Sequence, residues 1–310
     1  MSDEYLWDRT GEPDPEIARL ETLLAGYRYS ARPRRARPRL LALLALAACL
    51  VLLASATLWV HGNRASEWQI AGKRINVGQT IETGGASNAK LEAQFIGEVK
   101  LGPNSRLRVL RSNAGNPRLA LRRGTMHALI WAPPARFVVD TPSAKTIDPG
   151  CSYPLTVLPD DSGTLTVQTG WVAFQAGRVE SFIPAGAVCR TRPKLGPGLP
   201  YFENAPDALR DAVSKFDATG GRAGLDAILS SARKQDALTL WHLLVRTSGA
   251  DRDLVVQRFA SRVPEAGSSG LTAGLRAGKS AAFDQAWNLL GLGGAGWCAL
   301  NHSRGLFTIA

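Results

Sequence analysis

The sequence has few of the residues that build metal centres and disulfide scaffolds. It contains four cysteines in 310 residues, and no two of them form a C-x-x-C pair. This scarcity excludes a disulfide-stapled scaffold and leaves no ligand pair to seed a zinc site. Cys298 and His302 stand four residues apart, but no second pair accompanies them. We therefore predict neither a metal nor a cofactor.

Catalytic signatures are missing as well. The chain has no G-x-S-x-G nucleophile motif and no phosphate-binding P-loop. Residues 291–296 match G-x-G-x-x-G, but the sequence ends before the helix and second strand that a dinucleotide-binding unit requires. None of the four histidines lies in a motif, and they are far apart: His61, His127, His242 and His302. We predict that the chain is not an enzyme.

The composition is that of a globular protein with an uneven charge. Hydrophobic residues make up 45% of the chain, which excludes a disordered or fibrous chain and allows about two domains. The net charge is +11, yet residues 1–26 hold seven acidic and only two basic residues. An arginine cluster without acidic residues follows; its members are Arg28, Arg32, Arg34, Arg35, Arg37 and Arg39.

Residues 40–60 carry no charge at all. As a helix they would span about 31 Å at ~1.5 Å per residue, which is close to the hydrocarbon thickness of a bilayer. We predict a transmembrane helix here, and we interpret the arginine cluster as a topology signal rather than a nucleic-acid patch. This interpretation places residues 1–39 in the cytoplasm and residues 62–310 outside an inner membrane, with the lipid bilayer as a partner and no direct contact with nucleic acid.

Two other interpretations of this apolar run fit less well. A cleaved secretory signal has a short basic start, whereas this start is 39 residues long and acidic at its head. Leu46 to Cys49 resemble a bacterial lipoprotein cleavage box, but cleavage there would leave an apolar stretch in water.

Short alternating runs of apolar and polar residues occur from about residue 72 to residue 190, within a predicted β domain that covers residues 62–190. Examples lie at 91–95, 107–109, 137–140, 165–168 and 171–174. Alternation with period two puts the apolar side chains of a strand on one face. Glycine and proline separate the runs, which is typical of turns between strands. We predict an all-β domain, either a sandwich, a roll or a short solenoid.

Ordered motifs run through residues 75–190. They are VGQTIET (77–83), GASNAKL (85–91), GEVKL (97–101), NSRL (104–107), LALRRG (119–124), FVVDTPSA (137–144), VQTGWV (167–172) and IPAG (183–186). In this order the set resembles the FecR family, the extracytoplasmic domain of bacterial single-pass anti-sigma regulators and sensors.

The motif residues are predicted to be structural, because glycine tolerates positive φ at strand ends and proline cannot extend a ladder. This structural set comprises Gly78, Thr83, Gly124, Thr141, Pro142, Gly150, Gly170 and Gly186. If the segment lies in an oxidising compartment, Cys151 and Cys189 could form a disulfide, which spacing alone leaves open.

The pattern changes after the strand-rich segment. Residues 191–205 are rich in proline and glycine and are predicted to form a linker. Apolar residues then recur with helical spacing, so we predict a small α-helical domain over 206–292 and a tail over 293–310. The overall expectation is a mixed, multi-domain protein.

The acidic N-terminal tail is the expected output region. Asp14 can cap a short helix that aligns Ile17, Leu20 and Leu24, and an aromatic cluster precedes it at Tyr5, Leu6 and Trp7. A helix this short is not stable alone and needs a partner. These six apolar and aromatic residues are the predicted contact.

The family resemblance implies that this partner is an extracytoplasmic-function sigma factor. The chain would then relay an extracytoplasmic signal across the membrane as an anti-sigma regulator, with an unknown envelope protein or ligand as its outer partner. The tail also resembles the opening of short anti-sigma domains, although the His and Cys ligands of the common zinc-binding anti-sigma finger are absent. The alternative is an envelope interaction or scaffold module that binds protein or glycan and has no transcriptional output.

Overall fold

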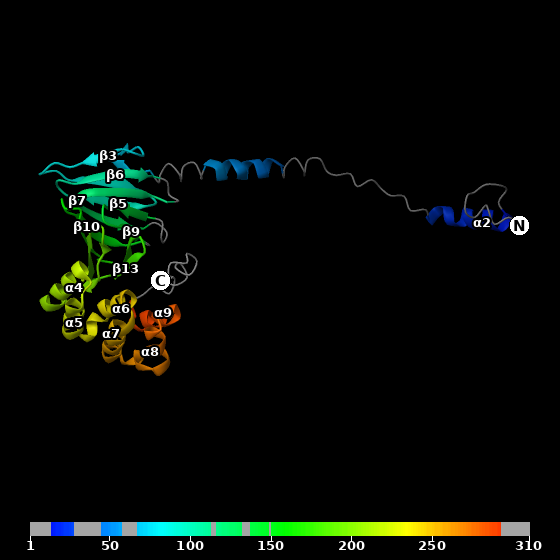
Figure 1. Cartoon of the computed structure of the whole chain (residues 1–310). Coiled ribbons are helices and arrows are strands. Elements are labelled where there is room, and N and C mark those ends of the chain that lie inside the picture. The colour runs from blue at the N-terminus through cyan, green and yellow to red at the C-terminus, as the bar shows by residue number, and fades with distance from the viewer. Residues whose placement is uncertain are drawn as a thin grey trace. The chain divides into compact units, whose positions relative to one another are not determined.

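A computed structural model describes residues 14–27, 45–57, 67–112, 116–131, 137–148 and 150–292. The chain divides into two compact units, Met1–Thr57 and Leu58–Ala310. Figure 1 shows the strands and most of the helices in the second unit.

The first unit contains a short helix and a helical apolar segment. Helix α2, Pro15–Leu24, begins after Asp14, whose side chain accepts a hydrogen bond from the Glu16 amide at 2.9 Å. The 3₁₀ turn η1, Ala25–Tyr27, follows directly. Further along the chain, residues 45–57 are helical.

The predicted transmembrane helix over residues 40–60 is not supported. Within the described parts of the chain, no helix is both long and apolar enough to cross a membrane. The predictions of a membrane-spanning helix and of a single-pass inner-membrane location are therefore wrong.

In its described residues, the second unit is built on one hydrogen-bonded network of sixteen strands, arranged as two sheets that share strand β7, Arg118–Ile130. The other strands of sheet A are β1 Gln69–Ile70, β2 Lys73–Arg74, β4 Ala89–Ala93, β5 Gly97–Leu101, β10 Ser152–Val157, β11 Gly163–Thr166, β14 Ala187–Arg192, β15 Gly196–Pro197 and β16 Tyr201–Phe202. The other strands of sheet B are β3 Thr80–Glu82, β6 Arg106–Arg111, β8 Phe137–Asp140, β9 Lys145–Asp148, β12 Trp171–Ala176 and β13 Val179–Pro184. Among the strands of the described residues, only β7 and β8 pair in parallel; the other pairs are antiparallel.

Strand β7 changes sheets at Gly124. Before this residue β7 pairs with β6 and β8 in sheet B, and from it onward with β10 and β5 in sheet A. Gly124 has φ +88°, and a Cβ there would lie 2.4 Å from Cα of Ser105. Only glycine fits such a position, because other residues clash with the neighbouring strand and are strained at positive φ. The predicted strand-end glycine thus marks the crossing between the sheets.

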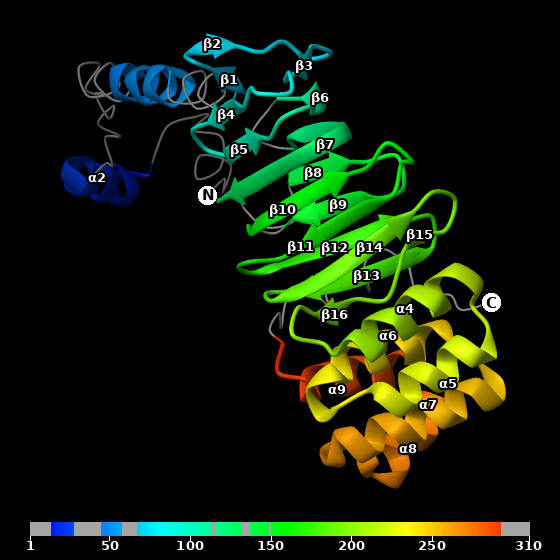
Figure 2. The same ribbon diagram turned by 90° about the vertical axis from the view of Figure 1, so that its left-hand side faces the viewer.

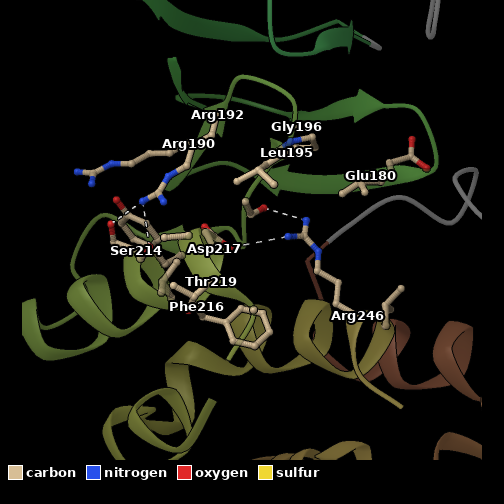
Figure 3. Close-up of a pocket in the computed structure, with 18 of the residues that line it drawn as sticks. Glu180, Arg190, Arg192, Leu195, Gly196, Ser214, Phe216, Asp217, Thr219 and Arg246 are labelled. Atoms are coloured by element: carbon tan, nitrogen blue, oxygen red, sulfur yellow. Dashed lines mark hydrogen bonds and ion pairs between the residues drawn. The ribbon is translucent and has the colours of Figure 1, made fainter. Parts of the chain in front are cut away.

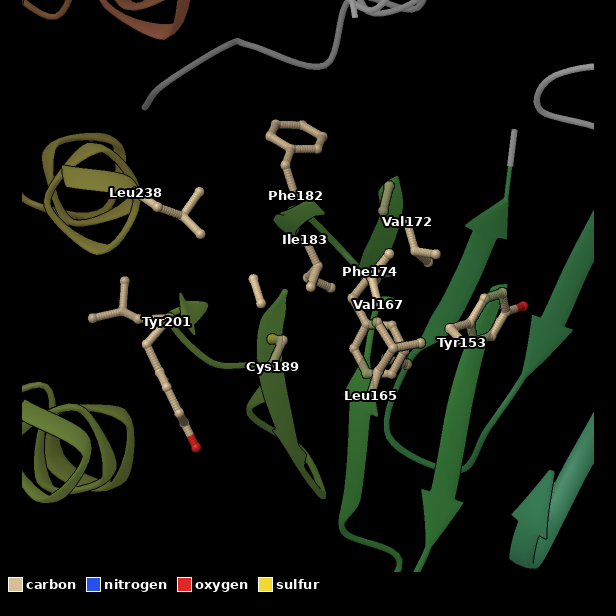
Figure 4. Packing of buried hydrophobic residues seen from close by; sticks show 14 of the residues in the cluster. Tyr153, Leu165, Val167, Val172, Phe174, Phe182, Ile183, Cys189, Tyr201 and Leu238 are labelled. Atoms are coloured by element: carbon tan, nitrogen blue, oxygen red, sulfur yellow. The ribbon is translucent and has the colours of Figure 1, made fainter. Parts of the chain in front are cut away.

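Apolar side chains from both sheets fill one core. Their burial alternates along the strands, as in β5, where Val99 and Leu101 are buried and Lys100 is exposed. The core continues without a break into the helices, and Figure 4 shows the side chain of Leu238, on a helix, pointing toward the strands. The strand-rich and helical segments are therefore packed on each other.

Residues 191–205 differ from the predicted linker. They contain the end of β14 together with β15 and β16, and Leu199, Tyr201 and Ala205 are buried. The prolines are tolerated because these short strands lie at the margin of sheet A, where few ladder donors are needed. The segment joins the sheet rather than separating two domains.

Six α-helices and two 3₁₀ turns are described after the sheet. They are α4 Asp207–Thr219, α5 Arg222–Ser231, η2 Lys234–Asp236, α6 Ala237–Arg246, α7 Gly249–Arg262, η3 Pro264–Gly267, α8 Ser269–Arg276 and α9 Ser280–Leu289. Figure 2 shows these helices gathered at the end of the sheets that carries β13 to β16.

An aromatic cluster fastens the helices to β13. The ring of Phe182 lies 6.0 Å from that of Trp241 and 5.7 Å from that of Trp287, centroid to centroid. His242 completes the cluster and accepts a hydrogen bond from the Phe182 amide at Nε2, at 2.9 Å. Such ring pairs add to the stability gained from burial.

The disulfide left open by the sequence does not form. Cys151 and Cys189 are buried and both are free thiols. Burial raises the pKa of Cys189 to about 12, so this thiol stays protonated and unreactive at neutral pH.

Candidate functional site

Helix α2 exposes most of its apolar face. Leu20 is 57% exposed and Leu24 is 61% exposed, and no residue of the helix is buried. Ile17 is half-buried and lies on the same face, one turn before Leu20 and two before Leu24. A face of this kind is typical of a helix that docks in a groove of a partner.

The other predicted contact residues, Tyr5, Leu6 and Trp7, lie outside the described residues. The arginine cluster between residues 28 and 39, predicted as a topology signal, lies outside them as well. Their predicted roles stay predictions.

The predicted structural residues are spread over the turns of both sheets. The Thr83 hydroxyl donates to the Gly102 carbonyl at 2.7 Å and accepts from the Ser105 amide at 2.8 Å. The Thr141 hydroxyl accepts from the Ala144 amide at 3.0 Å in the turn that contains Pro142. The remaining glycines of this set have positive φ: Gly78, Gly150, Gly170 and Gly186. Nothing gathers these residues into one site.

A pocket of about 590 Å³ lies where the sheets meet the helices. Its lining comes from β13, β14 and β15 on one side and from α4 and α6 on the other (Figure 3). We call it the junction pocket. Five arginines line it, namely Arg178, Arg190, Arg192, Arg210 and Arg246. Only two acidic residues accompany them, Glu180 and Asp217, so the lining has an excess of positive charge.

The inner end of the junction pocket is lined by an ion pair between Asp217 and Arg246, and hydrogen bonds to other protein groups fix the positions of both side chains. Asp217 accepts hydrogen bonds from the Leu199 amide at 3.0 and 3.1 Å and lies 3.9 Å from the Arg246 guanidinium. Arg246 also donates to the Gly198 carbonyl at 2.9 Å and to the Ser181 hydroxyl. Burial raises the pKa of Asp217 to about 6, although the nearby Arg246 opposes this shift.

The outer part of the junction pocket carries arginines on neighbouring elements. Arg192 donates to the Ser214 carbonyl at 3.0 Å and to its hydroxyl at 3.1 Å, which ties β14 to α4. Burial raises the pKa of the Tyr201 phenol, while the charges of Arg190 and Arg210 act in the opposite direction. All three residues line the junction pocket.

The junction pocket could hardly be predicted from the sequence. Its charged residues are distributed over positions 178–246, without a motif or a common period. The one local signal was Arg190, Arg192 and Lys194 within the segment near the predicted linker. Within the described part of the chain, no group of three or more His, Cys, Asp or Glu side chains is placed to hold a metal.

In comparisons with known proteins, two solved structures are similar to part of this chain. No family model matches the sequence, so the resemblance to the FecR family stays a prediction, and no curated protein matches it. Two crystal structures of a putative anti-sigma factor from Parabacteroides distasonis ATCC 8503 are similar in part, each with a TM-score of 0.36 and 15% identity. Each match covers 43% of this chain and 63% of the other, so this chain spans less than two thirds of their length.

Proposed function

We propose that this chain is a regulator of the anti-sigma type, which binds a sigma factor through helix α2 and withholds it from transcription. The observation that carries the proposal is the apolar face of α2, whose leucines lie in water although the helix has formed. A ten-residue helix is only marginally stable alone. Docking on a partner would both bury the leucines and stabilise the helix.

The charge of the tail supports the same partner class. Residues 1–26 have an excess of acidic residues, whereas the chain as a whole is basic. Proteins that bind DNA carry basic surfaces, and an acidic segment is attracted to such surfaces. An acidic, amphipathic helix therefore suits a sigma factor, whose DNA-binding face it could cover.

Binding of the full-length chain to purified extracytoplasmic-function sigma factors of its source organism tests the proposal. The test variant is Leu20→Ala with Leu24→Ala, and the matched control is Thr22→Ala on the opposite face of α2. Alanine preserves helix propensity, so the two leucine changes remove contact area rather than the helix. A fully buried leucine contributes about 1.5–3 kcal/mol, so each lost leucine should weaken binding about tenfold or more.

The control should bind as tightly as the unaltered chain in isothermal titration calorimetry. If none of the sigma factors binds, or if the double variant binds as tightly as the control, α2 is not the docking element and the proposal fails.

A further inference from the structure

We propose that the junction pocket is a binding site for a phosphate monoester with a small apolar body. The pocket belongs to the second unit, and none of its lining residues comes from α2. The inference is therefore independent of the proposed sigma-factor contact, and either one can fail without the other.

The first argument is charge. Five guanidinium groups and two carboxyl groups line the pocket, and Arg210 also pairs with Asp207 outside the lining at 3.2 Å, so an excess of two positive charges remains. Guanidinium presents a planar set of N–H donors that matches the oxygens of a phosphate group. A phosphate monoester carries close to two negative charges at neutral pH and offers three such oxygens.

The second argument is that part of this charge is not used by the fold. Arg246 and Arg192 are engaged by protein groups at the inner end of the pocket and beside α4. Among the described residues, in contrast, neither Arg178 nor Arg190 has an acidic side chain as an ion-pair partner, and both are exposed. Guanidinium groups without an acidic partner are available to an incoming anion.

The third argument is the size and the apolar part of the lining. A volume of about 590 Å³ lies within the range of roughly 300–1,000 Å³ that is typical of small-molecule sites. Leu195, which is 55% exposed, lines the pocket together with Val213 and Phe216. These side chains would contact the apolar body of the ligand while its phosphate group faces the arginines.

Phenyl phosphate is the probe that carries both features, and its binding to the full-length protein is measured by isothermal titration calorimetry. Inorganic phosphate lacks the apolar body, and benzoate carries the ring with a single negative charge. We expect phenyl phosphate to bind at least fivefold more tightly than either of them. Equal affinity for benzoate or for inorganic phosphate would overturn the proposal, and so would no binding at millimolar concentration.

Matched variants locate the binding in the pocket. Arg190→Gln removes one pocket guanidinium, whereas Arg122→Gln removes the same charge from an exposed position on β7. A charge-assisted hydrogen bond is worth enough that Arg190→Gln should weaken phenyl phosphate binding about tenfold. Arg122→Gln should leave it unchanged. Equal losses in the two variants would mean that the probe responds only to net charge, and the assignment to this pocket would be wrong.

Discussion

His242 should make the stability of the second unit strongly dependent on pH. Its Nε2 accepts from the Phe182 amide at 2.9 Å, so this nitrogen carries no proton, and Nδ1 donates to the Leu238 carbonyl at 2.9 Å. The side chain is buried among Phe182, Trp241 and Trp287. Burial lowers the pKa of His242 to about 3, and the charge of Arg246 acts in the same direction.

The sign and size of the effect follow from linkage. Because the folded-state pKa lies below the unfolded value of 6.5, the unfolded chain binds a proton first as the pH falls. Stability is therefore complete above pH ~6.5 and is lost as the pH falls toward 3. At pH 4.5, two units below the unfolded-state pKa of 6.5, protonation of His242 in the unfolded chain lowers the free energy of unfolding by about 3 kcal/mol.

Urea unfolding of the unaltered chain and of His242→Gln, at pH 7.5 and at pH 4.5, measures this loss. Glutamine can place Oε1 where Nε2 accepts the Phe182 amide, but it does not titrate. The variant should be less stable at pH 7.5, and at pH 4.5 the difference should shift by about 3 kcal/mol in its favour. Subtracting the free energy of unfolding of the variant from that of the unaltered chain at each pH removes the contribution of Asp217 and of every other group that titrates in both proteins.

Parallel pH profiles for the two proteins would refute this reasoning, because they would mean that His242 titrates alike in the folded and unfolded states. A second reading comes from the nitrogen chemical shifts of the imidazole. They should report a neutral ring protonated at Nδ1 down to pH 5 in the folded protein.

Two further predictions concern the sheet crossing and the pocket. Gly124→Ala should destabilise the chain by about 2–4 kcal/mol in urea unfolding, because it adds both strain at positive φ and a clash with Ser105. The control is Gly72→Ala, which should show the strain alone, because Gly72 has φ +77° and a Cβ there would meet nothing within 4 Å. Equal losses would contradict the clash. Because the folded-state pKa of Asp217 is raised to about 6, its proton stabilises the fold as the pH falls below 6. Between pH 7.5 and 4.5 the unaltered chain should therefore gain about 2 kcal/mol relative to Asp217→Asn, and a constant difference would show that the carboxyl is not perturbed.

Periodicity predicted the kinds of elements but not how they join. The structure has a strand at residues 97–101, where apolar residues alternate, and a helix at residues 237–246, where they have helical spacing. Both patterns reflect which side of the element is buried. The same reasoning placed a linker at 191–205, because proline and glycine usually interrupt structure. Those residues instead complete the margin of the sheet, where their backbone pairs with β14.

Hydropathy gave the least reliable prediction. The absence of charge over residues 40–60 indicated a membrane span, but no helix in the described parts of the chain is long and apolar enough to cross a membrane. The apolar face of α2 was predicted from spacing alone, because positions three and four apart lie on one side of any helix.

The sequence by itself determined the properties that neighbouring residues share, namely the period of each segment, the turns at glycine and proline, and the acidic tail with its leucine stripe. Only the tertiary structure decided that β7 crosses between two sheets at Gly124, that His242 is buried under β13, and that arginines from β14, α4 and α6 line one pocket. The reason is physical. Local patterns record which face of an element avoids water, whereas pockets and buried polar groups arise where elements distant in the sequence pack together.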